Sequence, residues 1–273
     1  MAGARGSLGA PPRPPVPPGA RSRSRHPRRR GGTLTGPWLA IDTATDIASV
    51  ALGSADRVRG VRSVRGARRH AAQIVPLVDQ VLTMTAVRVR NLGLVIVADG
   101  PGSFTGLRIG WAAAKGLAHD VGIPLRTVPS LMGAAHAAAQ GEVGPVAGCF
   151  DALRGQVFGA VYAFPPGRVE TLVAPDLFTI ESLARATPVR PLVAVGDGAL
   201  LYADAVLAWT GRAPLGLEAV PPVAGALLAL AGREGASRPL DDPATAEPHY
   251  GRPAEAQAKW EAHHGRPLPY SSR

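Results

Sequence analysis

The sequence predicts an α/β fold, and three observations indicate it. An apolar run at 92–98 is followed by a glycine-rich turn and an amphipathic run at 107–121, the pattern of a buried strand, a tight turn and a helix. Strand patterns precede this unit, and strand and helix patterns alternate after it. The chain of 273 residues is also long enough to bury a sizeable core, in one large domain or two small ones.

The first 37 residues form a low-complexity segment rich in Pro, Arg, Gly and Ser, and we expect this arm to be disordered. The formal net charge is +10, and eight arginines without any acid in residues 1–36 leave only +2 for the rest. Such an arm can bind RNA phosphates without sequence preference, or it can be a solvated extension without a function of its own. No secretory signal or membrane-spanning run is visible, so we expect a cytoplasmic protein.

The elements after the arm follow the order strand, strand, strand, helix, strand, helix, strand, helix, which is that of one actin-like or ribonuclease H-like half. The expected strands are 38–42, 47–53, 57–65, 92–98 and 123–128, and the expected helices are 68–83, 107–121 and 130–140. This gives a first lobe at 38–141.

The second lobe is expected at 142–252, smaller than the first, followed by a polar tail at 253–273. It begins with the segment 146–164, which contains a hairpin, and continues with apolar segments at 168–174 and 191–198 and expected helices at 200–209 and 221–231.

The glycine-rich turn GPGSFTGLRIG, residues 100–110, is the first candidate site. Its glycines let the backbone turn sharply and approach another group closely, and its hydroxyls and arginine lie at the positively polarised start of a helix. The loop can therefore hold an anion, although a purely structural turn explains the same residues, and the spacing matches neither standard nucleotide loop. The candidate residues are Gly102, Ser103, Thr105, Gly106 and Arg108.

A second candidate lies at the end of the first strand, where Asp42 and Thr43 begin the sequence DTAT. A carboxylate followed by hydroxyls in a tight turn resembles the first phosphate loop of the actin, Hsp70 and sugar-kinase superfamily, in which the Asp holds the water shell of magnesium. The glycine usual two residues after that Asp is Ala44 here. A turn with Asx-type hydrogen bonds explains the same residues equally well.

The longer string GPGSFTGLRIGWAAAKGLAHDVGIPLRTVPSL closely resembles the signature of the TsaB family, also called YeaZ. The resemblance covers roughly 38–252, and it implies a two-lobed actin-like ATPase (ASKHA) fold with a reduced second lobe. DALRGQVF at 151–158 is similar to the hairpin DARRGEVY of the family, which implies that Asp151 and Arg154 pair across the turn. The terminal Pro-x-Tyr-x-Arg element of the family has its counterparts in Pro248, Tyr250 and Arg252.

The resemblance implies a function in making N6-threonylcarbamoyladenosine, beside the anticodon of tRNA. The chain would be a non-catalytic subunit that binds and stabilises a TsaD-like catalytic subunit, with a TsaE-like ATPase as third member, tRNA reached through the complex, and a homodimer when alone. No cofactor is expected beyond ATP or ADP at the subunit boundary. The contact surface would be the helices 68–83 and 107–121, through Ala71, Ile74, Val75, Val78, Leu107, Trp111 and Ala114.

No catalytic or metal-binding constellation is visible in the sequence. None of His70, His119 and His136 has a second histidine four residues later, so the paired-histidine metal site of TsaD-like enzymes is not expected. Three alternatives remain at this point. They are an active ATPase or sugar kinase using Asp42 and the 100–108 loop, a metallopeptidase, which lacks its histidine pair, and an RNA-binding module acting through the arm.

Overall fold

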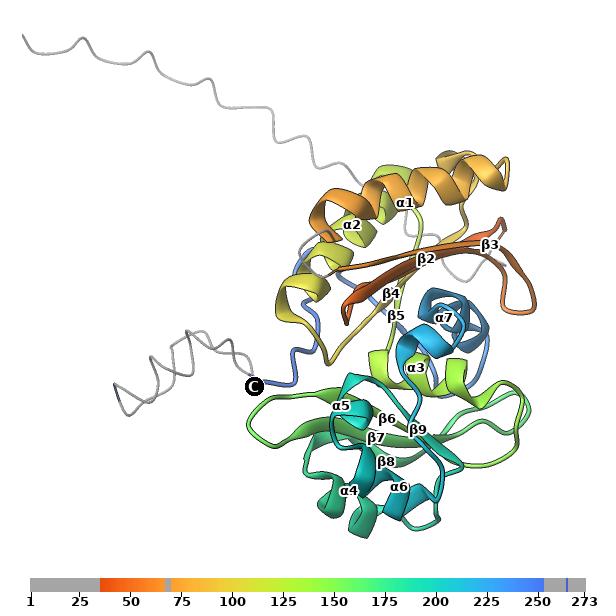
Figure 1. Ribbon diagram of the computed structural model, residues 1–273. Coiled ribbons are helices and arrows are strands. Elements are labelled where there is room, and N and C mark those ends of the chain that lie inside the picture. The colour runs from red at the N-terminus through yellow and green to blue at the C-terminus, as the bar shows by residue number, and fades with distance from the viewer. Residues whose placement is uncertain (1–34, 67–69, 253–263, 265–273) are drawn as a thin grey trace, which may run out of the picture. The chain divides into compact units, whose positions relative to one another are not determined.

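A computed structural model describes residues 35–66, 70–252 and 264. Two mixed β-sheets organise this part of the chain (Figure 1). The expected arm falls outside the described residues up to residue 34, and so does the expected tail apart from residue 264.

The first sheet has the strand order β10-β5-β4-β1-β2-β3. Its central strands β1 and β4 run parallel, β5 continues parallel to β4, and β1, β2 and β3 form an antiparallel meander. The strands are β1 (Trp38–Asp42), β2 (Ile47–Gly53), β3 (Val58–Arg65), β4 (Leu94–Ala98), β5 (Leu125–Val128) and β10 (Arg238–Pro239). The bounds expected for β1 and β2 are those observed.

Helices cover both faces of this sheet (Figure 1). On one face, α1 (His70–Met84) packs on β2 and β3, and α2 (Phe104–Val121) packs on β4 and β1, in one apolar cluster that includes Leu39 and Ile41. On the other face, α7 (Val223–Ala231) packs on β1 and β2, beside Ala40. Every residue of β4 is buried, as expected for a strand with both faces covered.

The second sheet has the order β8-β7-β6-β9. The helix α3 (Ser130–Ala139) packs on one face of this sheet, against β6, β7 and β9. Helices α4, α5 and α6 pack on the other face of the sheet, around the buried Cys149. The remaining bounds are β6 (Val146–Asp151), β7 (Val157–Ala163), β8 (Glu170–Phe178), β9 (Val193–Val195), α4 (Ile180–Ala186), α5 (Asp197–Leu201), α6 (Ala203–Thr210), and the 3-10 turns η2 (Val89–Asn91) and η3 (Leu217–Ala219).

The chain returns to the first sheet after the second one is complete. Helix α7 and strand β10 both belong to the first sheet, although both lie beyond residue 216. Between the two sheets, α3 and α7 pack on each other (Figure 1). One apolar cluster runs from Ala40 through these helices to Phe150 and Tyr162. The expected lobe boundary near residue 141 stays a prediction. Because α7 and β10 belong to the first sheet, a division between the two sheets would cut the chain at two places, once before β6 and once before α7.

Among the described helices, none combines the length and the apolar character needed to cross a membrane.

Candidate functional site

The glycine-rich turn lies where the buried strand β4 gives way to α2. Gly100 donates its backbone N–H to the Ser130 hydroxyl oxygen at 2.8 Å, and its φ of +104° is one that glycine adopts without strain. A Cβ at this position would collide with the carbonyl oxygen of His249. Glycine is required here because the C-terminal segment passes directly over the turn.

The DTAT turn forms the neighbouring wall of the site. Asp42 is 2% exposed, and its Oδ1 accepts a hydrogen bond from the backbone N–H of Ala44 at 3.2 Å, as in an Asx turn. Burial raises the pKa of Asp42 to about 7, while backbone N–H groups of Ala44 and Thr43 act in the opposite direction. A substantial fraction of this carboxyl group is therefore protonated at neutral pH.

These two predicted loops lie against each other. The backbone N–H of Ser103 donates to the carbonyl oxygen of Ala44 at 2.6 Å, and the Thr43 hydroxyl donates to the carbonyl oxygen of Gly106 at 2.8 Å. A Cβ on Gly102 or Gly106 would collide with the backbone of the DTAT turn. The close approach that these glycines allow is therefore made to protein backbone.

The side chains of Ser103 and Arg108, two further candidate residues of the loop, both contact other parts of the protein. Ser103 caps α2, because its hydroxyl oxygen accepts from the N–H of Gly106 at 3.2 Å. Arg108 donates to the Tyr250 hydroxyl at 3.0 Å, and its guanidinium lies 4.3 Å from the ring centroid of Phe104. Thr105 is exposed.

This arrangement does not fit a nucleotide phosphate in the space between the two loops. The backbone of each loop occupies that space, and the Thr43 and Ser103 hydroxyls are already bonded. Binding of an anion or nucleotide elsewhere along these residues stays a prediction.

A second, partly buried carboxylate, which the sequence patterns had not singled out, precedes the glycine turn. Asp99 pairs with Arg238 of β10, with 3.3 Å between Oδ2 and Nη2. Burial raises the pKa of Asp99, and the charge of Arg238 opposes that rise. Its position directly after a buried strand was the available sequence signal, the same one that drew attention to Asp42.

The C-terminal segment ties the two sheets together at this site. The rings of Tyr250 and Phe104 lie with their centroids 4.5 Å apart. Two residues later, Arg252 donates to the carbonyl oxygen of Ala152 and to the side-chain oxygen of Gln156, in the β6–β7 turn. Tyr250 and Arg252 thus connect the start of α2 with the hairpin of the second sheet.

The hairpin turn corrects one expectation. Asp151 and Arg154 do not form an ion pair among the described residues, and the Asp151 carboxylate accepts from the N–H of Leu153 at 2.8 Å. Leu153 and Arg154 have φ values of +61° and +55°, which is uncommon for residues other than glycine. The cation that contacts this turn is Arg252, through the Ala152 carbonyl oxygen and the Gln156 side chain.

The helix residues expected to contact a partner are mostly core residues. Val75 is 67% exposed, and the side chain of Ala71 lies outside the described part of the chain. Both helices turn their apolar stripes to their own sheet, so a partner would meet the opposite side of each helix. The buried residues, each at most 6% exposed, are Ile74, Val78, Leu107, Trp111 and Ala114.

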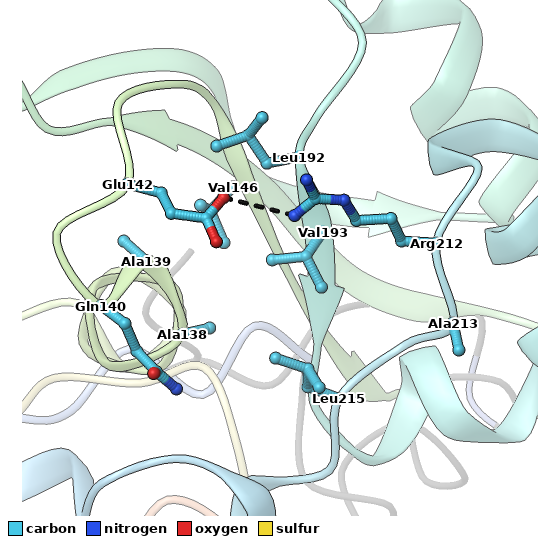
Figure 2. A pocket seen from close by; sticks show the side chains of 10 residues that line it. All are labelled: Ala138, Ala139, Gln140, Glu142, Val146, Leu192, Val193, Arg212, Ala213 and Leu215. Atoms are coloured by element: carbon cyan, nitrogen blue, oxygen red, sulfur yellow. Dashed lines mark hydrogen bonds and ion pairs between the residues drawn. The ribbon is translucent and has the colours of Figure 1, made fainter.

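A separate pocket of about 200 Å³ opens beside β9, away from both loops (Figure 2). Its floor is apolar, with Val146, Val193 and Leu215, and its rim carries the ion pair of Glu142 and Arg212 at 3.2 Å. None of the residues expected to hold an anion or a partner lines it. Within the part of the chain that the structure describes, no three His, Cys, Asp or Glu side chains are arranged to hold a metal ion.

Comparison with known proteins gives one family match. Residues 47–194, more than half of the chain, match the model of the family described as TsaD, tRNA N6-adenosine threonylcarbamoyltransferase. This range contains the glycine turn, both helices beside it and most of the second sheet.

Two curated relatives carry the description tRNA threonylcarbamoyladenosine biosynthesis protein TsaB. The protein of Bacillus subtilis is 36% identical over 140 residues, which is 50% of this chain and 59% of that protein. The protein of Escherichia coli is 37% identical over 125 residues, 45% of this chain and 54% of that protein. The chain thus spans little more than half the length of these relatives.

A solved structure, YeaZ from Pseudomonas aeruginosa, matches over 72% of this chain and 91% of its own, with 26% identity and a TM-score of 0.62. A second Pseudomonas aeruginosa structure, described as similar to peptidase YEAZ, matches over 80% and 100%, with a TM-score of 0.65. These matches and the two mixed sheets confirm the expected actin-like α/β fold.

Proposed function

Because this chain belongs to the TsaB/YeaZ family, we propose that it is a non-catalytic subunit in the formation of N6-threonylcarbamoyladenosine in tRNA. It binds and stabilises a TsaD-like catalytic subunit, and a TsaE-like ATPase completes the complex in the cytoplasm. The observation that carries the proposal is the similarity to the TsaB proteins of Bacillus subtilis and Escherichia coli, supported by the family match over residues 47–194 and a fold similar to YeaZ.

The geometry of the two loops supports a scaffolding role over phosphoryl transfer. Gly106 is hydrogen-bonded to both Thr43 and Ser103, and Asp42 is buried with an elevated pKa. A group that orders magnesium near phosphate works as an ionised carboxylate exposed to its ligand, whereas Asp42 is buried and only partly ionised at neutral pH.

The proposed contact surface is the solvent-facing side of α1 and α2, for the TsaD-like subunit and for a second copy when the chain is alone. Val75 and Met84 are exposed apolar side chains of α1, with exposed fractions of 67% and 44%. On α2, Ala112 and Gly116 are exposed, and a Cβ on Gly116 would meet no atom within 4 Å. Small residues one helical turn apart allow another helix to approach closely.

The test is co-purification of the tagged full chain with the TsaD-like subunit of the same organism, followed by gel filtration. Val75→Asp should abolish the complex, because a carboxylate would be buried at the contact. Val189→Asp is the matched control, since Val189 is 56% exposed and lies beyond α4 in the second lobe. A complex that survives Val75→Asp would place the contact elsewhere.

The function itself is tested by reconstitution. Adding the wild-type chain to the TsaD-like subunit, the ATPase, threonylcarbamoyl-AMP and unmodified tRNA should increase the yield of modified adenosine. No association and no increase in yield, together with magnesium-dependent ATP hydrolysis by the chain alone, would instead support the ATPase alternative.

A further inference from the structure

Four exposed arginines lie at the end of the first sheet opposite to the glycine turn. Arg57 and Arg59 are at the start of β3, and Arg88 and Arg90 are between α1 and β4. Because β1, β3 and β4 all run in the same direction, the starts of these strands share one end of the sheet. The glycine turn follows the other end of β4.

The two arginine-bearing segments touch each other. The guanidinium of Arg59 donates to the carbonyl oxygen of Thr85 at 3.3 Å, three residues before Arg88. Gly60 lies against the side chains of Met84 and Thr85. Figure 1 shows the turn between β2 and β3 and the segment after α1 on the same side of the molecule.

The charge of this arginine cluster is largely uncompensated. Among the ion pairs of the described residues, none involves Arg57, Arg59, Arg88 or Arg90. Exposed Asp56, in the neighbouring turn, offsets one of the four charges. By contrast, four other exposed arginines each lie close to a carboxylate, namely Arg65, Arg168, Arg185 and Arg212.

Residues 36 and 37, directly before β1, lie against the segment that carries Arg90. The backbone N–H of Gly93 donates to the carbonyl oxygen of Pro37 at 2.9 Å, and Gly36 lies against Asn91. The eight arginines of residues 1–36 thus precede, in sequence, a point of attachment beside Arg90. Charges commonly protect an edge strand such as β3, but that role does not explain Arg88 and Arg90, which lie off the edge.

We propose that this arginine cluster binds the phosphate backbone of RNA. The proposal rests on the proposed function, which makes tRNA the nucleic acid at hand. Guanidinium groups are well suited to phosphate oxygens, and exposed arginines without carboxylate partners release counterions when they bind a polyanion. The cluster contacts the backbone without reading sequence and steers tRNA to the complex from the side opposite to the glycine turn.

The experiment uses the full chain and an unmodified tRNA transcript, with fluorescence anisotropy between about 50 and 200 mM salt. The variant Arg57→Gln/Arg59→Gln/Arg88→Gln/Arg90→Gln should bind at least about tenfold more weakly, and the salt slope should be smaller by about 3. The matched control removes the same charge from Arg65, Arg168, Arg185 and Arg212, which lie close to Asp46, Glu170, Glu181 and Glu142.

Equal tRNA affinity and salt slope in the two variants would overturn the proposal, because net charge alone would then explain the binding. The proposal would also be overturned if the quadruple variant no longer bound the TsaD-like subunit but bound tRNA as the wild type does. The cluster would then be assigned to binding an acidic protein surface. Loss of tRNA binding with the TsaD-like complex intact would support it. If the wild-type chain binds tRNA but no TsaD-like subunit, the proposed function fails separately.

Discussion

The ring of Tyr250 lies on the ring of Phe104, with the two centroids 4.5 Å apart, and Arg108 contacts both residues. This stack fixes the C-terminal segment on the first turn of α2, directly beside the glycine turn. It is the tertiary contact that gives the Pro-x-Tyr-x-Arg element a physical role.

Replacing Tyr250 tests the strength of that attachment. Tyr250→Ala should lower the free energy of unfolding by about 1–2 kcal/mol, because it removes an aromatic pair and partly buried apolar area. Tyr250→Phe keeps the ring and loses the exposed hydrogen bond from Arg108, so its cost should stay below about 1 kcal/mol. Urea titration of both variants measures the difference, and equal costs would show that the stack contributes little.

Two glycines of α2 should respond to alanine in opposite directions. Gly106→Ala should cost about 2–3 kcal/mol, because the new methyl group would collide with the Thr43 carbonyl. Gly116→Ala should stabilise by about 0.5–1 kcal/mol, since the position is open and alanine favours a helix. Thermal unfolding compares the two, and a tolerated Gly106→Ala would mean that the two loops are not in contact in solution.

The elevated pKa of Asp42 predicts a pH dependence of stability. Between the ordinary value of 3.8 and about 7, the folded state binds a proton that the unfolded state has released, so this group stabilises the fold at low pH. Its contribution should be lost at about 1.4 kcal/mol per pH unit as the pH rises through that window.

Asp42→Asn provides the comparison for that prediction, because the amide oxygen can still accept from Ala44 and does not titrate. The difference in unfolding free energy between wild type and variant should shrink or change sign as the pH rises from about 5 to 8. Parallel urea curves at every pH would contradict the assignment of a buried, protonated carboxyl group.

Arg252 should restrain the β6–β7 turn. Arg252→Ala should increase amide hydrogen exchange at residues 152–157, since the turn loses both hydrogen bonds that the Arg252 side chain donates to it. Arg185→Ala, in an exposed position on α4, should leave exchange at this turn unchanged. Exchange followed by mass spectrometry would locate the effect, and uniform exchange across the two variants would argue against the restraint.

Local patterns in the sequence predicted most of the first sheet. The bounds of β1 and β2 follow from apolar runs ended by a polar turn, and such signals are complete within a few residues. Helix α2 begins at Phe104 where Leu107 was expected, because the Ser103 cap starts the helix before its first buried leucine. Helix α4 was not predicted, although Thr179 and Ser182 form a capping box at its start.

Local sequence patterns could not predict the contacts between segments that are far apart in the sequence. The periodicity of α1 identified an apolar stripe with Ile74 and Val78, but not whether a partner or the chain's own sheet covers it. The same limit applies to the glycine turn, because a glycine permits close approach without indicating what approaches. Here it is the backbone of Thr43 and Ala44. The pairing of β10 with β5 likewise depends on the return of the chain to the first sheet.

That return has a mechanical consequence. The polypeptide passes from one sheet to the other near residues 140–145 and comes back near 215–222, so two covalent connections join the halves. Rotation of one sheet relative to the other about the line between these two connections is therefore easier than other relative movements of the sheets. The two hydrogen bonds from Arg252 to the β6–β7 turn restrain this rotation, because they must break before the C-terminal segment and the turn can separate.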